Sequence, residues 1–352
     1  MAKISNLFRE KVYTIARSSE IFKNEKEIIN FIFKKFETEI KSVNFIDANE
    51  RNDLFKIKDV DGLESYIKLS LEENPNFFIE ADILARNFKK NISPRLIDAG
   101  YVESYGNISY SLTSSIPTQN IKEYGVATIV NNPQLISNLF LQLSKFNFDG
   151  IKIQSIYDYL EKYLSFDITK ISKINLSSPE ANPLIKELIQ NQTVNLKNIL
   201  TEKLKHINFD ETVFCHGNLN QSTILGFEDS LCCINFENAY IGDILFEILN
   251  LRYQLFYDQT TESKIIELFH KKTKQKLNLV HLKKYREFVN YWNLYKTCVD
   301  YLNEVFVLNS KRMNKILDLA FCFSKNYETY YQIPDFEKNF KPIAELFVES
   351  VI

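Results

Sequence analysis

The stretch from residue 212 to residue 238 constrains the fold most, because it interrupts a long helical pattern with two short strand-like pieces. The first piece reads TVFCH and the second reads LCCINF, and a polar loop begins directly after the first. Apolar residues on either side of this stretch recur at helical spacing. We therefore expect a β-hairpin carrying a functional loop inside an otherwise helical part of the chain.

The first part of the chain has a different pattern, in which short strands surround one inserted helix. Alternation of apolar and polar residues predicts strands at residues 41–48, 53–59, 63–70, 95–102 and 107–116. The dipeptide Asp61-Gly62 predicts a hairpin turn between the second and third of these strands. Helical spacing predicts helices over the first forty residues and at 75–90. This order predicts an α+β fold with a small antiparallel sheet.

The layout predicts two domains. An N-terminal helix and a small β-rich lobe would occupy residues 1–116, and a large helical lobe containing the hairpin would occupy residues 117–352. The helices expected in the second lobe lie at 156–164, 183–207, 243–256, 262–276, 280–307 and 311–331. The aromatic stripe of Tyr285, Phe288, Trp292 and Tyr295 has the spacing of a buried helix face, so we expect it in the core.

Composition excludes several classes of protein. A formal net charge of -2 provides no electrostatic footprint for nucleic acid. No run approaches the roughly 20 apolar residues of a membrane span, and the first residues lack the apolar region of a signal peptide. Five scattered cysteines argue for a reducing compartment, and the absence of clustered Cys and His argues against structural zinc. We expect a soluble cytoplasmic protein.

The segment HGNLNQSTIL, followed by CINFENAYIGDILFEI, resembles the catalytic segment of the aminoglycoside phosphotransferase and choline kinase family. The family pattern is His-Gly-Asp, an Asn further along, an Ile-Asp-Phe-Glu element and then Gly-Asp. His216, Glu237 and Asp243 keep the register of this pattern without a gap. The resemblance implies a bilobal protein-kinase-like fold and a small-molecule kinase with ATP as its cofactor.

The resemblance also implies roles for residues in both lobes. His216 and Asp243 would support the catalytic loop through hydrogen bonds. Lys68, in YIKLS, corresponds to the strand lysine that contacts the nucleotide phosphates. Glu80, in FFIEADILARNF, corresponds to the carboxylate partner of that lysine on the inserted helix.

Three positions that carry chemistry in the family differ in this chain. The family's catalytic Asp, which accepts the proton of the substrate hydroxyl, corresponds to Asn218, and its two magnesium ligands correspond to Thr223 and Asn235. An amide is not a base at physiological pH, and general-base assistance is typically worth about 10²–10⁴-fold. Magnesium prefers charged oxygen ligands, so these replacements argue against a magnesium site. Glu237 remains, at a position that can supply a second metal ligand in choline-kinase-like enzymes.

The sequence leaves three interpretations open. The first is a pseudokinase that binds nucleotide through Lys68 and Glu80, or binds another small molecule or a protein partner, without efficient phosphoryl transfer. The second is an active ATP-dependent small-molecule kinase that uses Glu237 and Asp243 as surrogate metal ligands, with proton removal by solvent. The third is a helical interaction protein whose resemblance to the family is fortuitous.

Overall fold

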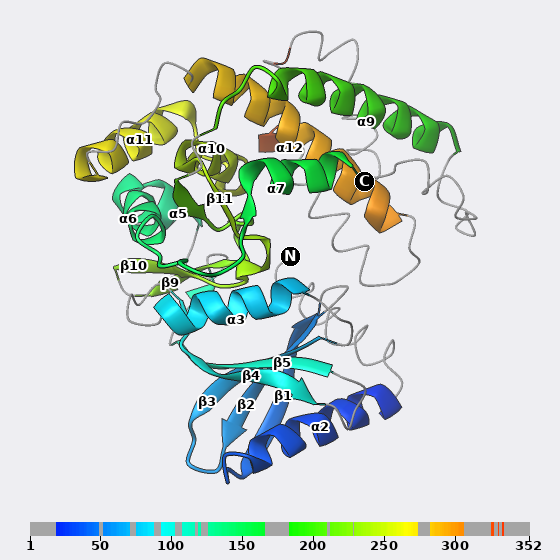
Figure 1. Cartoon of the computed structure of the whole chain (residues 1–352), viewed down its shortest axis with the longest axis vertical. Coiled ribbons are helices and arrows are strands. Elements are labelled where there is room, and N and C mark those ends of the chain that lie inside the picture. Colours follow the sequence, from blue (N-terminus) through cyan, green and yellow to red (C-terminus); the bar gives the residue numbers. More distant parts are fainter. Residues whose placement is uncertain are drawn as a thin grey trace. The chain divides into compact units, whose positions relative to one another are not determined.

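The computed structural model describes residues 19–48, 52–70, 75–87, 93–102, 108–116, 119–120, 126–165, 183–209, 212–227, 229–273, 282–305, 325–326, 330 and 333 (Figure 1). Its described residues fall into two compact units. The sheet unit draws on Ile15–Gln154 and Val213–Ile241, and the helical unit draws on Ser155–Thr212 and Gly242–Ile352. Neither unit is continuous in sequence, whereas the predicted domains, 1–116 and 117–352, are; that division stays a prediction.

The sheet unit is built on a five-stranded antiparallel sheet with the strand order β1-β2-β3-β5-β4. Its strands are β1 (Ile40–Ala48), β2 (Asn52–Asp59), β3 (Glu64–Ser70), β4 (Leu96–Val102) and β5 (Ile108–Ser114). All five strands lie where the alternating pattern predicted them. Gly62 has a φ of +87° in the turn between β2 and β3, which a glycine adopts without steric cost, so the Asp61-Gly62 hairpin is confirmed.

Helix α2 (Ser19–Lys34) forms the core of this unit together with the sheet (Figure 1). Its apolar residues Ile28, Ile29 and Ile32 recur at helical spacing and are buried against strand residues such as Phe55 and Ile67. Helix α3 (Pro75–Asn87) packs against β4 and against the 3₁₀ helix η3 (Phe236–Asn238). The rest of the predicted helix at 75–90 and the first eighteen residues of the predicted N-terminal helix lie outside the described residues.

Both predicted strand pieces are present, but they do not pair with each other, so the predicted hairpin between them is wrong. The first piece forms β8 (Val213–Cys215) in a sheet of order β7-β11-β8, with β7 at Gln154–Ser155 and β11 at Tyr240–Gly242. The second forms β10 (Ser230–Cys233), which pairs with β9 (Ile224–Phe227), and β9 also pairs with β6 (Gln119–Asn120). A turn at residues 220–223 reverses the chain after the polar loop, so Ile224 starts a new strand.

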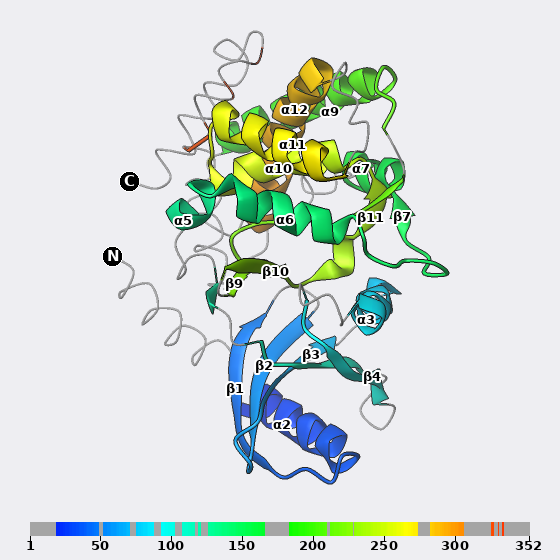
Figure 2. The ribbon, with the colours of Figure 1, turned by 90° about the vertical axis from the view of Figure 1, so that its left-hand side faces the viewer.

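Helices α5 (Val126–Val130) and α6 (Pro133–Leu143) complete the sheet unit, and α6 packs against β10 (Figure 2). Leu139 and Phe140 are buried in α6. Phe146, just after this helix, stacks on Phe214 with ring centroids 5.0 Å apart and lies 5.6 Å from Phe236. This aromatic cluster fixes β8, which directly precedes the polar loop, and η3, which contains Phe236 and Glu237 of the Asn-Phe-Glu element (residues 235–237).

The helical unit contains α7 (Ile156–Leu164), α9 (Pro183–Leu204), α10 (Ile244–Leu255), α11 (Gln259–Thr273) and α12 (Leu282–Val305). Helix α12 packs against α9 and α10, and α10 packs against α11. The predicted aromatic stripe is buried in α12, with Trp292 and Phe288 each 1% exposed. Most of the helix predicted at 311–331 lies outside the described residues. Within the described part of the chain, no helix has the length and apolar character that a membrane crossing requires.

Candidate functional site

A buried ammonium group lies at the centre of the candidate site, within the sheet unit. Lys68 Nζ donates hydrogen bonds to Glu80 Oε2 at 2.5 Å, to Glu237 Oε1 at 2.8 Å and to Asn235 Oδ1 at 3.0 Å. The lysine lies on β3, Glu80 on α3, and the other two residues at η3. The structure thus brings together four of the residues that the resemblance singled out. We call these four residues the Lys68 cluster.

The sheet geometry explains why Lys68 points into this cluster. Ile67 and Leu69 are fully buried on β3 and belong to the core shared with α2. Successive side chains of a strand point to opposite faces, so Lys68 points to the other face of the sheet. Glu80 comes from a helix whose neighbouring apolar residues Ala81 and Leu84 are buried, and its side chain is only 6% exposed.

Two carboxylates and one ammonium give the Lys68 cluster an excess negative charge. Burial opposes the charged form of Lys68, but Glu80 and Glu237 together outweigh burial and raise the pKa of the ammonium group. Burial and the charge of Glu237 outweigh Lys68 and raise the pKa of the Glu80 carboxyl. The negative charge of Glu237 contributes to both shifts, whereas burial, the largest cause at Glu80, acts in opposite directions on a carboxyl and an ammonium group.

Sequence reasoning missed Asn52, which extends the Lys68 cluster. Asn52 is 4% exposed, and its Nδ2 donates to Glu237 Oε1 at 2.7 Å. The sheet register contains the signal that could have found it. Leu54 lies opposite Lys68 in the β2–β3 pairing, so Asn52, two positions from Leu54, lies on the same face as the lysine.

His216 links the polar loop to the chain segment that follows β10. Its Nε2 donates to the carbonyl of Ile234 at 2.8 Å, and its Nδ1 accepts from the backbone N–H of Asn218 at 3.3 Å. Burial lowers the pKa of His216 to about 4, although the bond to Ile234 acts in the opposite direction. The imidazole is therefore neutral, with its proton on Nε2, and its ring lies 4.7 Å from that of Phe236.

The low pKa of His216 predicts that the protein loses stability as the pH falls. The unfolded histidine takes up a proton near pH 6.5, whereas the folded one resists protonation down to about pH 4. The stabilising contribution is therefore complete above pH 6.5 and decreases by about 3 kcal/mol between pH 6.5 and pH 4. Urea unfolding across this range measures it. His216→Gln keeps a hydrogen-bond donor but does not titrate in this range, so its free energy of unfolding should decrease less as the pH falls. A pH dependence equal to that of the wild type would contradict the low pKa of His216.

The polar loop uses Thr223 for its own structure. Thr223 Oγ1 donates to the carbonyl of Asn218 at 2.8 Å and accepts from the backbone N–H of Asn220 at 2.9 Å, and the side chain is buried. Among the described residues, the hydrogen bonds of Asn218 and of the Thr223 side chain stay within the segment 216–223. The backbone carbonyl of Thr223 accepts from the backbone N–H of Ile234 at 3.0 Å. The predicted positions of the base and of one metal ligand therefore make no direct bond to the Lys68 cluster.

Asn220 is a second residue that sequence reasoning missed. Its Oδ1 accepts from the backbone N–H groups of Ser222 at 2.8 Å and Thr223 at 3.2 Å, and its Nδ2 lies 3.3 Å from Asn218 Oδ1. An asparagine that bonds the backbone two residues on is typical of a tight turn, so Asn220 followed by Gln-Ser was the available signal. Asn220 thus shapes the turn between the polar loop and β9.

Asp243 lies in the helical unit, where it caps α10. Its Oδ1 accepts from the backbone N–H of Leu245 at 2.8 Å, as an N-cap side chain does. Its Oδ2 lies 2.8 Å from the hydroxyl of Tyr285 on α12. These contacts fix the start of α10. The predicted support of the catalytic loop by Asp243 stays a prediction.

The oxygen atoms at the predicted metal positions do not suit a divalent cation. Asn235 and Glu237 both accept from the Lys68 ammonium, and the Thr223 hydroxyl bonds within the loop. In the part of the chain that the structure describes, no three His, Cys, Asp or Glu side chains gather in a group that could hold a metal ion. Magnesium prefers several charged oxygens, and one carboxylate shared with an ammonium does not provide them.

No protein-family model and no curated protein matches the sequence. Solved structures do match. Spectinomycin phosphotransferase APH(9)-Ia, in complex with ADP and spectinomycin, is 13% identical, with a TM-score of 0.61 over 92% of this chain and 98% of its own. Amicoumacin kinase hAmiN, in complex with AMP-PNP, Ca²⁺ and Ami, is 12% identical, with a TM-score of 0.59 over 89% and 97%.

Choline kinase LicA from Streptococcus pneumoniae is 12% identical, with a TM-score of 0.57 over 86% of this chain and 99% of its own. Matches at this level of identity show the fold. The chain therefore has the α+β, protein-kinase-like fold of aminoglycoside phosphotransferases and choline kinase, and the predicted fold class is confirmed.

Proposed function

We propose that the protein is a pseudokinase of the aminoglycoside phosphotransferase and choline kinase type, which binds a nucleotide at Lys68 and does not transfer its phosphoryl group efficiently. The observation that carries this proposal is the composition of the Lys68 cluster. The lysine and its partner Glu80 are joined at 2.5 Å, whereas the neighbouring metal-ligand position is the neutral Asn235.

Nucleotide binding is supported by Lys68 and by the fold. A lysine ammonium is a standard ligand of nucleotide phosphates, and a carboxylate partner fixes its position. Glu80 fixes it here from α3, and Glu80 Oε1 in turn accepts from the backbone N–H of Phe236 at 3.3 Å. Proteins of the same fold have been crystallised with ADP and with AMP-PNP. These observations support ATP as the ligand.

Inefficient transfer is supported by Asn218 and by the donor atoms around Lys68. The amide of Asn218 can orient a hydroxyl group but cannot accept its proton, which removes a contribution of about 10²–10⁴-fold. Phosphoryl transfer also depends on cations that neutralise the developing charge. Asn235 stands where the family has an Asp and Thr223 where it has an Asn, so neither metal position carries a charge, and the carboxylate of Glu237 that remains is paired with Lys68.

We assign His216 and Asp243 to the scaffold of the site. His216 is neutral and bonded to two backbone groups, so it holds the loop after β8 against the segment after β10. Asp243 fixes the start of α10, the helix that directly follows the Asn-Phe-Glu element and β11. The scaffold of a kinase site is thus retained in a chain whose reacting groups are replaced.

We also propose a cytoplasmic location, because the described cysteines have the character of thiols in a reducing compartment. Cys215, Cys232, Cys233 and Cys298 are free and buried. Burial raises the pKa of Cys232 and of Cys298 to about 12, which keeps these thiols protonated and unreactive.

Replacement of Lys68 by methionine tests the nucleotide site. In the wild-type protein, ATP at about one hundred times its Kd should stabilise the fold by about 3 kcal/mol, a rise of several degrees in Tm. Lys68→Met removes the ammonium that binds phosphate, so its ATP-dependent rise should vanish. Because the variant also leaves two buried carboxylates without a cation, the ATP-dependent change in Tm is compared rather than Tm itself.

Lys56→Met is the matched control, since Lys56 lies on the neighbouring strand β2 and pairs with Glu64 at a partly exposed position. It should keep the full ATP-dependent rise in Tm. The same samples, mixed with ATP, magnesium and a metabolite extract, should yield no phosphorylated product by mass spectrometry. Rapid ATP-dependent product formation that Glu237→Gln abolishes would favour the active-kinase interpretation and contradict the proposal.

A further inference from the structure

The hydrogen-bonding capacity of Lys68 is fully used within the chain. An ammonium group has three N–H donors, and the described acceptors around Lys68 are Glu80, Asn235 and Glu237, at 2.5, 3.0 and 2.8 Å. The Lys68 side chain is 11% exposed. A phosphate oxygen that binds this ammonium must therefore replace one of the three acceptors.

Glu80 is the acceptor most firmly held in place. Its Oε2 takes the shortest bond from Lys68, and its Oε1 accepts from the backbone N–H of Phe236 at 3.3 Å. Its side chain is 6% exposed. Displacement of Glu80 would leave a carboxylate buried away from water without its cation, which is costly.

Glu237 is easier to displace. Its side chain is 17% exposed, about three times the exposure of Glu80, and its other described partner is the neutral amide of Asn52. It lies on η3, a helix of three residues, so a change of its rotamer disturbs no long element. A carboxylate and a phosphate both present anionic oxygens to an ammonium, so one can take the place of the other.

The charge of the Lys68 cluster favours the same exchange. Glu80 and Glu237 together exceed the single positive charge of Lys68, so a phosphate added beside both carboxylates would meet repulsion. Withdrawal of Glu237 toward water lowers that repulsion and frees one donor. Asn235 contributes no charge, and since its Oδ1 faces Lys68, its Nδ2 remains a donor that an anion can use.

We infer that Glu237 is an internal competitor of the nucleotide phosphate, an inference that rests on the proposed nucleotide site. Its carboxylate occupies the position at Lys68 that a phosphate takes in the absence of a divalent cation, and its displacement limits the affinity. This is the reverse of a metal ligand, because a metal ligand strengthens nucleotide binding whereas an internal competitor weakens it.

Calorimetric titration with AMP-PNP in EDTA tests the inference on wild-type protein and on Glu237→Gln. Glutamine keeps the size of the side chain and removes its charge, so the variant should bind AMP-PNP at least about tenfold more tightly. A tenfold change corresponds to about 1.4 kcal/mol, near the lower end of coupling energies measured for close charge pairs. Glu237→Ala should change the affinity in the same direction and serves if the glutamine variant does not fold.

Glu64→Gln is the matched control, because Glu64 is a partly exposed carboxylate of the same sheet, paired with Lys56. It should leave the affinity for AMP-PNP unchanged. A general effect of lowering the protein's negative charge would tighten binding in both variants equally, and that result would overturn the inference.

The remaining outcomes separate this inference from the proposed function. Binding of AMP-PNP to wild-type protein in EDTA, with equal or weaker binding to Glu237→Gln, overturns the inference and leaves the nucleotide site standing. Binding that requires magnesium and is lost in Glu237→Gln identifies Glu237 as a metal ligand; it overturns the inference and contradicts the part of the proposed function that denies the site a cation. No binding to either protein overturns the nucleotide site and the inference together.

Discussion

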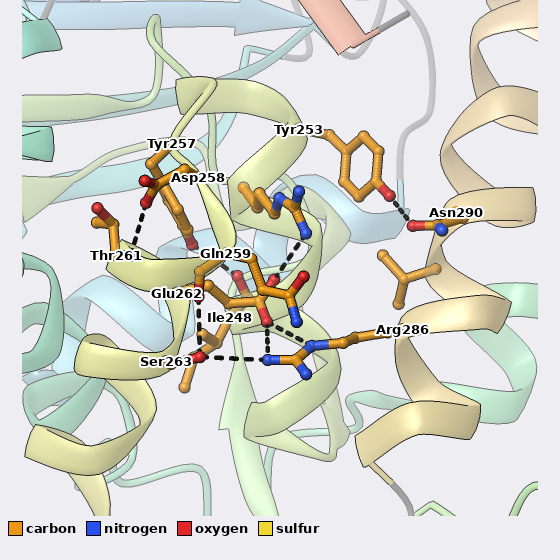
Figure 3. Close-up of polar contacts among 12 residues, drawn as sticks. Ile248, Tyr253, Tyr257, Asp258, Gln259, Thr261, Glu262, Ser263, Arg286 and Asn290 are labelled. Atoms are coloured by element: carbon orange, nitrogen blue, oxygen red, sulfur yellow. Dashed lines mark hydrogen bonds and ion pairs between the residues drawn. The ribbon is translucent and has the colours of Figure 1, made fainter. Parts of the chain in front are cut away.

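Replacement of Glu262 by alanine is expected to lower the free energy of unfolding by about 3 kcal/mol, the lower end of the cost of breaking a buried ion pair. Glu262 lies in the first turn of α11, and its side chain is 1% exposed. Its Oε1 accepts from Arg286 Nε at 2.7 Å, and its Oε2 lies 3.4 Å from Arg252 Nη1. Figure 3 shows the carboxylate of Glu262 and the guanidinium of Arg286 pointing toward each other.

The expected loss is large because two arginines share this one carboxylate. The side chains of Arg252 and Arg286 are 12% and 25% exposed, so water would replace the lost acceptor only in part. The contacts also join α11 to α10 and to α12, which makes Glu262 a link among three helices. Urea unfolding of the variant measures the change, and Glu262→Gln should lose less, because it keeps an oxygen acceptor.

Glu287→Ala provides the control for an exposed ion pair. Glu287 lies on α12 and accepts from Lys203 Nζ at 2.6 Å, but its side chain is 46% exposed. Exposed pairs contribute about 0–1 kcal/mol, so this variant should be nearly as stable as the wild type. Equal losses in the two variants would show that burial of Glu262 has no energetic role.

Replacement of Gly217 by alanine is expected to destabilise the protein by at least about 3 kcal/mol, since it combines backbone strain with a steric clash. Gly217 has a φ of +78°, a conformation that residues with a Cβ rarely adopt. A Cβ at this position would lie 2.0 Å from the carbonyl oxygen of Asn238. That oxygen belongs to the backbone of η3, so the clash is relieved only by moving the helix that carries Glu237.

Gly150→Ala is the matched control for Gly217→Ala. Gly150 has a similar φ of +72°, and a Cβ there would meet no atom within 4 Å. The loss of stability in Gly150→Ala should therefore be limited to the backbone strain, about 1–2 kcal/mol. Thermal or urea unfolding compares the two variants, and Gly217→Ala should in addition lose its ATP-dependent rise in Tm. Similar stability in both variants would contradict the close approach of Gly217 to η3.

Much of the fold could be predicted because local patterns determine it. Alternation identified the five strands, and the Asp61-Gly62 turn fixed one register of the sheet. Strand β9 was not predicted, because Ile224–Phe227 is short and follows a polar loop whose reversal depends on the side chain of Asn220. Glu262 was not predicted to be buried either, since a charged residue near the start of a helix has the pattern of a solvated one until its partners on other helices are known.

The candidate site was predicted in part. The resemblance identified Lys68 and Glu80 as partners, and the structure places them 2.5 Å apart. It did not predict that Glu237 also pairs with Lys68, because that contact joins residues 169 positions apart and depends on how η3 lies against β3. Nor did it predict that Thr223 would bond within the loop. Contacts of this kind depend on tertiary packing, which the spacing of residues along the sequence does not predict.

The most direct test of the central claim is the Tm of the wild-type protein with ATP, measured in EDTA and again in magnesium. A nucleotide site built on Lys68 without a metal ion predicts a rise in Tm in EDTA. Magnesium should add little to this rise, and no ATP should be consumed. A Tm that rises only when magnesium is present, together with turnover of ATP, would contradict the account.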